Sequence, residues 1–371
     1  MICVVICVSC IAMFIYSGFR RTKKSSPKLF YGKSDLHEYI LNNVPRLKEP
    51  YTPPWGLWNR HVHTIICCFD PLPPNYKREN ILLPDGGLVS LDWLDNEAGL
   101  TDTSPVLVVI PGVGGGKEGI RTVCKLATGK FRVAVFNRRG HCGTLLTTPR
   151  LQCFGETSDF RQCVEYIHRK YPKAAMAGVA YSAGTGILSK YLGEYAGRSY
   201  IGPSVFVGSG FDLSKLESMN TIYEKLILYL LKTSLVKPNE RMLKSAVDID
   251  AVYKSKSIEE LEDHLYCKMH GYKDVDEMWL HNDPMLNADT VVAPVLCINS
   301  MDDPICVDGN IPYHHFQRPN WMLATTEQGG HCGFLENYKL ESWAGKLALD
   351  YIGAVLDYNN TMEEKDITLE C

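Results

Sequence analysis

Short apolar segments alternate along this chain with segments whose apolar residues recur at helical spacing. A fully apolar run of about five residues is typical of a strand that is buried on both faces of a parallel sheet. Strands that alternate with helices predict a mostly parallel, doubly wound α/β sheet. The predicted strands are residues 106–110, 132–136, 174–179 and 200–207, with two more inside residues 293–304 and 321–334, and the clearest helices are residues 160–171 and 187–195.

Two segments depart from this alternation. Residues 81–94 contain two apolar stretches around Asp85-Gly86-Gly87, which predicts a β-hairpin. Residues 212–286 are rich in helical patterns and carry no strong strand signal. An insertion of this kind, ahead of the strand in residues 293–304, predicts a helical cap over a binding site.

The N-terminal segment reads as a membrane span. Residues 1–19 carry no charge and are followed by Arg20, Arg21, Lys23 and Lys24. About 20 apolar residues span a bilayer. The basic start and the small-residue cleavage site of a signal peptide, the competing interpretation, are missing. We therefore expect an uncleaved anchor in the endoplasmic reticulum or another endomembrane, and the basic flank favours a cytosolic position for the rest of the chain.

The remainder divides into three parts by composition. Residues 20–54 form a polar, proline-dotted connector with one short helical stretch near residues 36–41. Residues 55–356 hold the predicted sheet, with the cap at about residues 212–286. Residues 357–371 are polar and acidic, which predicts a disordered tail.

Composition narrows the class of protein. Hydrophobic residues make up 45% of the 371 residues, enough for a sizeable core. A formal net charge of −3 gives no indication of a nucleic-acid partner. The 14 cysteines are scattered, without the paired spacing of a zinc site or a disulfide framework, which fits a reducing compartment. We expect no cofactor and no metal.

The pentapeptide Ala180-Tyr181-Ser182-Ala183-Gly184 is the most informative local pattern. It follows a predicted strand and opens a predicted helix. A serine flanked by small residues at such a turn is typical of a nucleophile elbow, although an ordinary turn is the competing interpretation. We take Ser182 as the candidate nucleophile.

A base and an acid follow in the chain. His331 stands among glycines after the last predicted strand, and the preceding strand ends in Asp302 and Asp303. The order serine, aspartate, histidine is that of α/β-hydrolases. Adjacent strand-end residues point to opposite sides, so only one aspartate can face His331. We prefer Asp303, with Asp302 as a loop cap and Asp212 as a third candidate.

Residues 111–116, Pro-Gly-Val-Gly-Gly-Gly, follow the first buried strand. Such a loop, with the amide after the nucleophile, can form an oxyanion hole. We assign this role to the N–H groups of Val113 and Ala183. A phosphate loop is the rival, but Lys117 is followed by Glu118 rather than Ser or Thr. A plain turn is the third interpretation.

The segment Asn137-Arg138-Arg139-Gly140 follows another strand. It could line a pocket for a lipid head group. We favour a structural role in which Arg139 joins loops by pairing with a carboxylate such as Asp159, because the guanidinium fork suits buried ion pairs.

These and further motifs resemble family four of the AB hydrolase superfamily, from about Trp55 to Tyr351. The motifs are Leu83-Pro84-Asp85-Gly86-Gly87, Leu91-Asp92-Trp93, Asn137-Arg138-Arg139-Gly140, Leu146-Thr147-Thr148-Pro149-Arg150, Lys190-Tyr191-Leu192-Gly193 and Gly329-Gly330-His331-Cys332-Gly333-Phe334-Leu335-Glu336. The chain departs from the family at Ala180, where glycine is usual, and at residues 183–185, where the family usually has Met-Gly-Gly.

The resemblance implies an α/β-hydrolase fold, with a helical cap insertion and a preceding transmembrane helix. It implies that Ser182, Asp303 and His331 form the charge relay. It also implies a single-pass membrane serine hydrolase that acts on phospholipids or acylglycerols.

Three functions fit these residues: a lipid ester hydrolase that works through an acyl-enzyme on Ser182, an acyltransferase with the same acyl-enzyme, and a non-catalytic lipid or steroid binder. The His-x4-Asp motif credited to acyltransferases of the family is not found in the sequence. No triad position is substituted, which argues against the binder. We therefore expect a membrane-anchored serine hydrolase with a lipid ester as its substrate.

Overall fold

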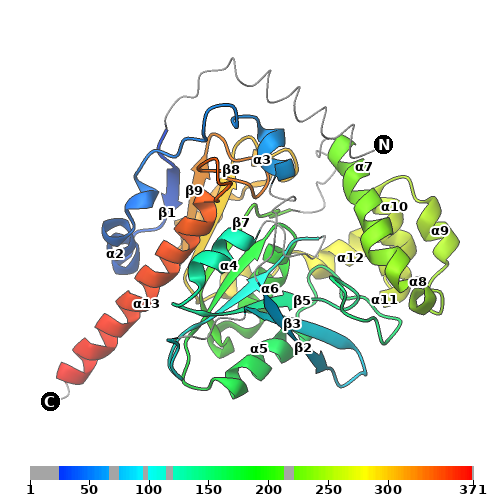
Figure 1. The fold of residues 1–371 in the computed structure, drawn as a ribbon, viewed down its shortest axis with the longest axis horizontal. Helices are drawn as coiled ribbons and strands as arrows, with labels where there is room; N and C mark the ends of the chain where they lie inside the picture. Colours follow the sequence, from blue (N-terminus) through cyan, green and yellow to red (C-terminus); the bar gives the residue numbers. More distant parts are fainter. Residues whose placement is uncertain (1–24, 67–74, 95–98, 114–119, 213–220, 370–371) are drawn as a thin grey trace.

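The computed structural model describes residues 25–66, 75–94, 99–113, 120–212 and 221–369 (Figure 1). Its strands are β1 (Lys28–Tyr31), β2 (Tyr76–Leu82), β3 (Leu88–Leu94), β4 (Val106–Ile110), β5 (Arg132–Asn137), β6 (Met176–Tyr181), β7 (Ile201–Val207), β8 (Val295–Ser300) and β9 (Trp321–Thr326). They form a nine-stranded sheet with the order β1-β9-β8-β7-β6-β4-β5-β3-β2. Strands β4 to β9 are parallel, whereas β1, β2 and β3 pair antiparallel. The predicted α/β sheet is confirmed.

Helices cover both faces of the sheet (Figure 1). The helices on one face are α2 (Asp35–Asn43), α4 (Arg121–Ala127) and α13 (Trp343–Leu369), and those on the other are α5 (Ser158–Lys170) and α6 (Gly184–Tyr195). Because side chains alternate along a strand, Leu107 and Val109 of β4 enter one core while Val106 and Val108 enter the other. This two-sided burial explains why the central strands are apolar throughout.

A group of helices from residues 221–282 lies to one side of the sheet (Figure 1). Three of these helices begin at a side-chain cap, since Asp248, Ser257 and Asp274 each accept a hydrogen bond from a backbone N–H in the first turn. The α-helices are α7 (Thr221–Leu230), α8 (Lys237–Leu243), α9 (Ile249–Lys254), α10 (Ile258–Glu262), α11 (Lys268–His270) and α12 (Val275–Asn282), with π-helical turns at Leu231–Val236 and Asp263–Cys267. They share their own apolar core, and we refer to them as the cap.

Residues 20–54, predicted as a connector with one short helix near residues 36–41, form part of the fold where they are described, and the predicted helix corresponds to α2. Strand β1 pairs with β9, and α2 buries Ile40 completely. Arg46 forms ion pairs with Glu336 at 3.2 Å and with Asp350 at 2.9 Å. Strand β1 is held at the sheet edge by backbone hydrogen bonds to β9, which require no particular pattern of side chains. For this reason the sequence pattern did not reveal the strand.

The C-terminal segment also differs from its prediction. Residues 357–371 were expected to be disordered, but α13 continues to Leu369 and projects beyond the sheet (Figure 1). Trp343, Leu347 and Tyr351 anchor its first turns in the core. Once a helix is nucleated, residues without proline or glycine extend it at little cost.

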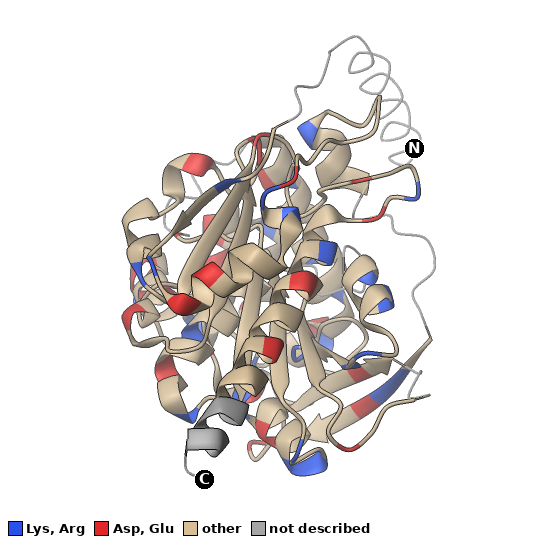
Figure 2. Cartoon of the chain, turned by 90° about the vertical axis from the view of Figure 1, so that its left-hand side faces the viewer, with Lys and Arg blue, Asp and Glu red and all other residues tan. Residues whose placement is uncertain are grey.

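The predicted anchor, residues 1–19, lies outside the described residues. Among the residues that are described, no helix is long and apolar enough to cross a membrane. Basic and acidic residues are interspersed over the elements (Figure 2), in line with the small net charge.

Candidate active site

Ser182 lies on a sharp turn between β6 and α6. Its φ is 50°, in the left-handed region that non-glycine residues rarely adopt. Its N–H donates to the carbonyl of Val207 at 2.9 Å, which ties the turn to β7. A Cβ on Gly184 would lie 2.5 Å from the carbonyl oxygens of Ile110 and Pro111, so only glycine fits there. Ala180, the departure from the family pattern, is fully buried within β6.

The side chains of Ser182, His331 and Asp303 form one hydrogen-bonded series. His331 Nε2 is 2.7 Å from Ser182 Oγ, and His331 Nδ1 is 2.8 Å from Asp303 Oδ2. An ionised carboxylate can only accept hydrogen bonds, so it selects the tautomer with the proton on Nδ1. Nε2 is then left to accept the hydroxyl proton of Ser182.

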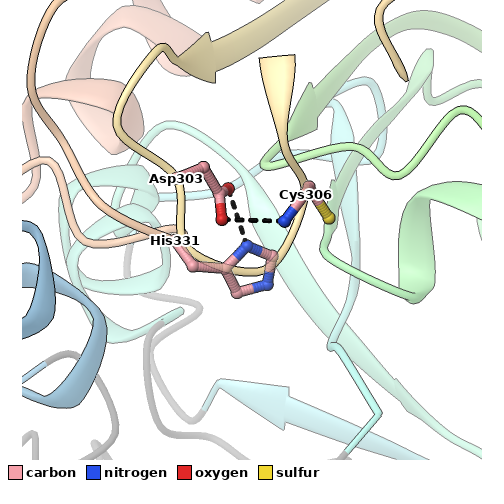
Figure 3. Close-up of side chains that lie close together, drawn as sticks. All are labelled: Asp303, Cys306 and His331. Atoms are coloured by element: carbon pink, nitrogen blue, oxygen red, sulfur yellow. Dashed lines mark hydrogen bonds and ion pairs between the residues drawn. The ribbon is translucent and has the colours of Figure 1, made fainter. Parts of the chain in front are cut away.

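The Asp303 carboxylate is held on both oxygens. While Oδ2 faces His331, Oδ1 accepts the N–H of Cys306 at 2.9 Å (Figure 3). Oδ1 also accepts the N–H of Ile305 at 2.8 Å. Asp303 is 4% exposed and His331 is 8% exposed. The pair is therefore oriented by the loop after β8 and shielded from water.

Asp302 has a different position. Its Oδ1 accepts the N–H of Gly330 at 2.9 Å, so it holds the histidine loop rather than the imidazole ring. Burial raises the pKa of Asp302 to about 6. Asp212, the third candidate, lies half-buried after the end of β7. The geometry thus puts Asp303 on the ring, as the sequence analysis preferred.

The basicity of His331 reflects two opposing effects. Burial lowers its pKa and is the largest single effect. The charge and hydrogen bond of Asp303, together with the neighbouring thiols of Cys332 and Cys306, outweigh it, and the pKa of His331 lies well above 6.5. A base with a raised pKa takes a proton from a hydroxyl more readily. The arrangement suits an imidazole that becomes cationic during a reaction.

Helix α3 (Arg60–Ile66) supports the histidine loop, which the sequence analysis missed. Thr64 Oγ1 accepts the N–H of His331 at 2.9 Å, and His63 Nδ1 accepts the N–H of Leu335 at 3.0 Å. A Cβ on Gly330 would lie 2.4 Å from the carbonyl oxygen of Arg60. The glycines around His331 in the sequence are the feature that could have indicated this close approach of α3 to the histidine loop.

The loop after β4 lies beside the serine. A Cβ on Gly112 would lie 3.1 Å from Ser182 Cβ and 3.6 Å from its Oγ. Within the described residues, no hydrogen bond uses the N–H of Val113 or Ala183. Unengaged amides near a nucleophile can stabilise an oxyanion.

Arg138 holds this loop from behind. Its Nη2 donates to the carbonyl oxygens of Gly112 and Val113, each at 3.2 Å. Arg138 is 4% exposed, and burial lowers its pKa. The sequence analysis favoured a structural role for this segment but assigned it to Arg139, and it missed the contact of Arg138 with the loop after β4. Strands β4 and β5 are parallel neighbours, so their carboxyl ends lie together.

The predicted structural role of Arg139 is confirmed. Its Nε and Nη2 donate to the two oxygens of Asp159 at 2.6 and 2.7 Å, and its Nη1 donates to Asp85 at 2.6 Å. Arg139 is 2% exposed and Asp159 is 1% exposed. This buried ion pair joins the hairpin, the loop after β5 and α5.

The apolar core of the cap reaches the site. Val113, Ala183 and Ile305, which flank the serine, the oxyanion loop and the acid loop, pack against it. The core also includes Phe154 and Tyr266, whose ring centroids are 5.2 Å apart. An apolar group bound beside Ser182 would therefore meet apolar side chains.

A serine on a strained turn, a histidine and an aspartate, each at the carboxyl end of a parallel strand and in this chain order, define a serine hydrolase of the α/β-hydrolase fold. No protein-family model matches the chain. Protein ABHD15 of Homo sapiens is 32% identical over 325 residues, which cover 82% of this chain and 69% of that protein. Phospholipase ABHD3 of Homo sapiens is 28% identical over 353 residues, or 91% of this chain and 86% of that protein.

Monoacylglycerol lipase ABHD2 of Mus musculus is 26% identical over 381 residues, which cover 93% of this chain and 89% of that protein. With these relatives, the chain belongs to the AB hydrolase superfamily. It is an esterase or lipase of this family, a carboxylic-ester hydrolase by class.

Proposed function

We propose that this protein is a membrane-anchored hydrolase of phospholipids or acylglycerols, with Ser182, His331 and Asp303 as its catalytic residues. The observation that carries the proposal is the continuous hydrogen-bonded series from Ser182 Oγ through His331 to Asp303. We expect the reaction to need neither a cofactor nor a metal.

In this mechanism Ser182 Oγ attacks the ester carbonyl carbon while its proton passes to His331 Nε2. Asp303 stabilises the resulting imidazolium. The N–H groups of Val113 and Ala183 stabilise the oxyanion of the tetrahedral intermediate. The imidazolium protonates the leaving alcohol, and water then repeats the steps, releasing the fatty acid and restoring the serine.

Two apolar features favour a lipid as the substrate. The cap core meets the oxyanion loop, where an acyl chain of the substrate would lie. Helix α7 also presents an apolar face to solvent, with Ile222 75%, Tyr229 51%, Leu226 39% and Leu230 39% exposed, whereas Tyr223 and Leu228 are buried. Exposed apolar patches on a soluble surface mark sites of protein or membrane contact. The names of ABHD3 and ABHD2 point to phospholipids and monoacylglycerols respectively.

The anchor completes the proposal. The uncharged residues 1–19 and the basic residues that follow support a span in an endomembrane, with the hydrolase domain on the cytosolic side. Residues between the span and β1 are few, so the cap and α7 would stay near the bilayer. A tethered enzyme meets its lipid at a high effective concentration.

The test is a lipid panel offered to the purified full chain in vesicles. Phospholipids, mono-, di- and triacylglycerols are each supplied with and without a lipid alcohol, and free fatty acid and new esters are quantified. The expected result is fatty acid release from phospholipid or acylglycerol. New ester as the main product would instead indicate an acyltransferase, and no product from any lipid would indicate a binder.

A second comparison isolates the anchor. Removal of residues 1–24 is expected to release the protein from membranes and to slow vesicle hydrolysis, with little change for a soluble short-chain ester. If the truncated protein also loses activity on the short-chain ester, the segment is structural and the tether is the wrong explanation.

A further inference from the structure

One thiol beside the triad has no part in the hydrolysis. Asp303, Cys306 and His331 each place a metal-binding atom within 4.8 Å of the others (Figure 3). Asp303 and His331 are buried, and Cys306 is partly exposed. The catalytic steps above use the backbone N–H of Cys306 but not its side chain.

The local backbone keeps this thiol at the histidine. The N–H groups of Ile305 and Cys306 both donate to Asp303 Oδ1, so the loop wraps around the carboxylate. The Cys306 Sγ lies within 4.8 Å of the ligand atoms of Asp303 and His331. Cys332, the neighbour of His331, has a different setting. Its Sγ lies 3.5 Å from the carbonyl oxygen of Val207 and packs tightly on Gly208. Cys306 is therefore the more accessible sulfur ligand.

We propose that Asp303, Cys306 and His331 bind Zn²⁺, and that this ion inhibits the enzyme reversibly. Carboxylate, thiolate and imidazole are the ligands that zinc prefers in proteins, at about 2.0–2.3 Å. A tetrahedral centre with such bonds has ligand atoms about 3.3–3.8 Å apart. To bind the ion, separations that now reach up to 4.8 Å have to shorten by about 1 Å, and Asp303 Oδ2 and His331 Nδ1, now 2.8 Å apart, have to separate by about 0.5 Å. A water molecule takes the fourth position. The thiol gives up its proton to solvent when the metal binds.

Inhibition follows whichever imidazole nitrogen the metal takes. Binding through Nδ1 replaces the hydrogen bond to Asp303, and binding through Nε2 replaces the one to Ser182. A metal on Nε2 occupies the lone pair that must accept the Ser182 proton. A metal on Nδ1 displaces the Asp303 hydrogen bond that orients the ring. The ion also neutralises Asp303, which the imidazolium needs as its counter-charge.

The binding test does not depend on catalysis. The probe is zinc chloride titrated calorimetrically into the full-length protein with Ser182→Ala, in which hydrolysis plays no part. One zinc per chain is expected, and Cys306→Ala should weaken the affinity at least about tenfold, since even an outer partner of a metal ligand contributes about that much. Cys142→Ala is the matched control, because Cys142 is the other partly exposed cysteine of the described residues.

A spectroscopic measurement on the unmodified protein tests the site even if the Cys306→Ala variant does not fold. Cobalt added to the unmodified protein should give a thiolate charge-transfer band, and zinc should displace it. Equal zinc affinity with and without Cys306, or a cobalt spectrum without thiolate character, would overturn the site.

The inhibitory part rests on the proposed function and is tested separately. Each variant's esterase rate with buffered free zinc is divided by its own rate in chelator. The unmodified enzyme and Cys142→Ala should lose activity with zinc but not with magnesium, and Cys306→Ala should need at least about tenfold more zinc. Rates in chelator report on the triad without metal. A protein that is inactive in chelator but still binds zinc would contradict the proposed hydrolase function and leave the metal site standing. Equal zinc sensitivity of all three proteins contradicts the inhibition.

Discussion

At the scale of single residues, two adjacent aspartates have separate tasks. Asp303 accepts from the His331 ring, whereas Asp302 accepts from the backbone of Gly330. Strand-end alternation is enough to predict that only one of them faces the histidine. Which of the two aspartates faces the histidine depends on the conformation of the loop after β8. The two side chains are identical, so they carry no information on this choice.

The aspartates give a matched pair of substitutions. Asp303→Asn is expected to lower kcat by about 10⁴-fold, because the amide cannot hold the required imidazole tautomer. Asp302→Asn keeps an acceptor for Gly330 and should lower kcat by less than about tenfold, since one hydrogen bond contributes about 1 kcal/mol. Steady-state kinetics on a soluble ester measures both. The reverse order of the two effects would assign the acid to Asp302.

Arg138 illustrates a residue that no local motif identifies. Replacing it by lysine removes the fork that spans the carbonyl oxygens of Gly112 and Val113. We expect kcat to fall about 10- to 100-fold with KM little changed, less than the loss of an oxyanion donor itself. Partial rescue of Arg138→Ala by guanidinium would support the positioning role. A raised KM with unchanged kcat would favour a head-group contact instead.

At the scale of secondary-structure elements, the predictions succeeded where the residues of a strand are all buried and therefore all apolar. The strand predicted at residues 106–110 has the same bounds as β4, because each of its residues is buried on one face or the other. Mixed patterns gave a less even result: the hairpin predicted at residues 81–94 is present as the turn between β2 and β3, whereas β1 reads as part of a connector because its burial is partial. The contact of α3 with the histidine loop joins distant segments, so only the fold reveals it.

The cap carries a buried acid that makes its stability depend on pH. Burial raises the pKa of Glu262 to about 8, and its carboxyl accepts a hydrogen bond from Trp279 at 3.1 Å. The unfolded chain releases this proton near pH 4.3. The folded form binds more protons between these values, so the free energy of unfolding falls as pH rises, by at most about 1.4 kcal/mol per pH unit.

Glu262→Gln keeps the acceptor for Trp279 but removes the titration. The melting temperature of the unmodified protein should fall more between pH 6 and pH 9 (roughly the range set by that pKa) than that of the variant. Differential scanning calorimetry at several pH values makes the comparison. Parallel curves for the two proteins would mean that Glu262 is ionised in the fold.

Helix α7 gives a second prediction at this scale. Leu226→Glu combined with Tyr229→Glu should slow hydrolysis of vesicle lipid while a soluble short-chain ester is cleaved at a similar rate, because charge opposes insertion into the bilayer. Leu280→Glu on α12 is the control, since Leu280 is also an exposed apolar residue of the cap, at 66%. Equal losses for both proteins on vesicles would remove the special role of α7.

At the scale of the whole molecule, the site is a product of sheet topology. β6, β8 and β9 are parallel and lie within one sheet, so the residues that follow their carboxyl ends converge although they are distant in the sequence. The order of serine, aspartate and histidine in the sequence is therefore enough to predict that the three residues meet. The proximity of Cys306 to His331 had no such signal, because it depends on the path of one loop.

The central claim is that Ser182 is the nucleophile, and covalent labelling tests it most directly. The purified protein is treated with a fluorophosphonate, digested, and the modified peptide is identified by mass spectrometry, with Ser182→Ala in parallel. The account predicts one adduct on Ser182, with neither labelling nor ester hydrolysis by a folded Ser182→Ala protein. An adduct on another residue, or hydrolysis that survives in Ser182→Ala, would contradict it.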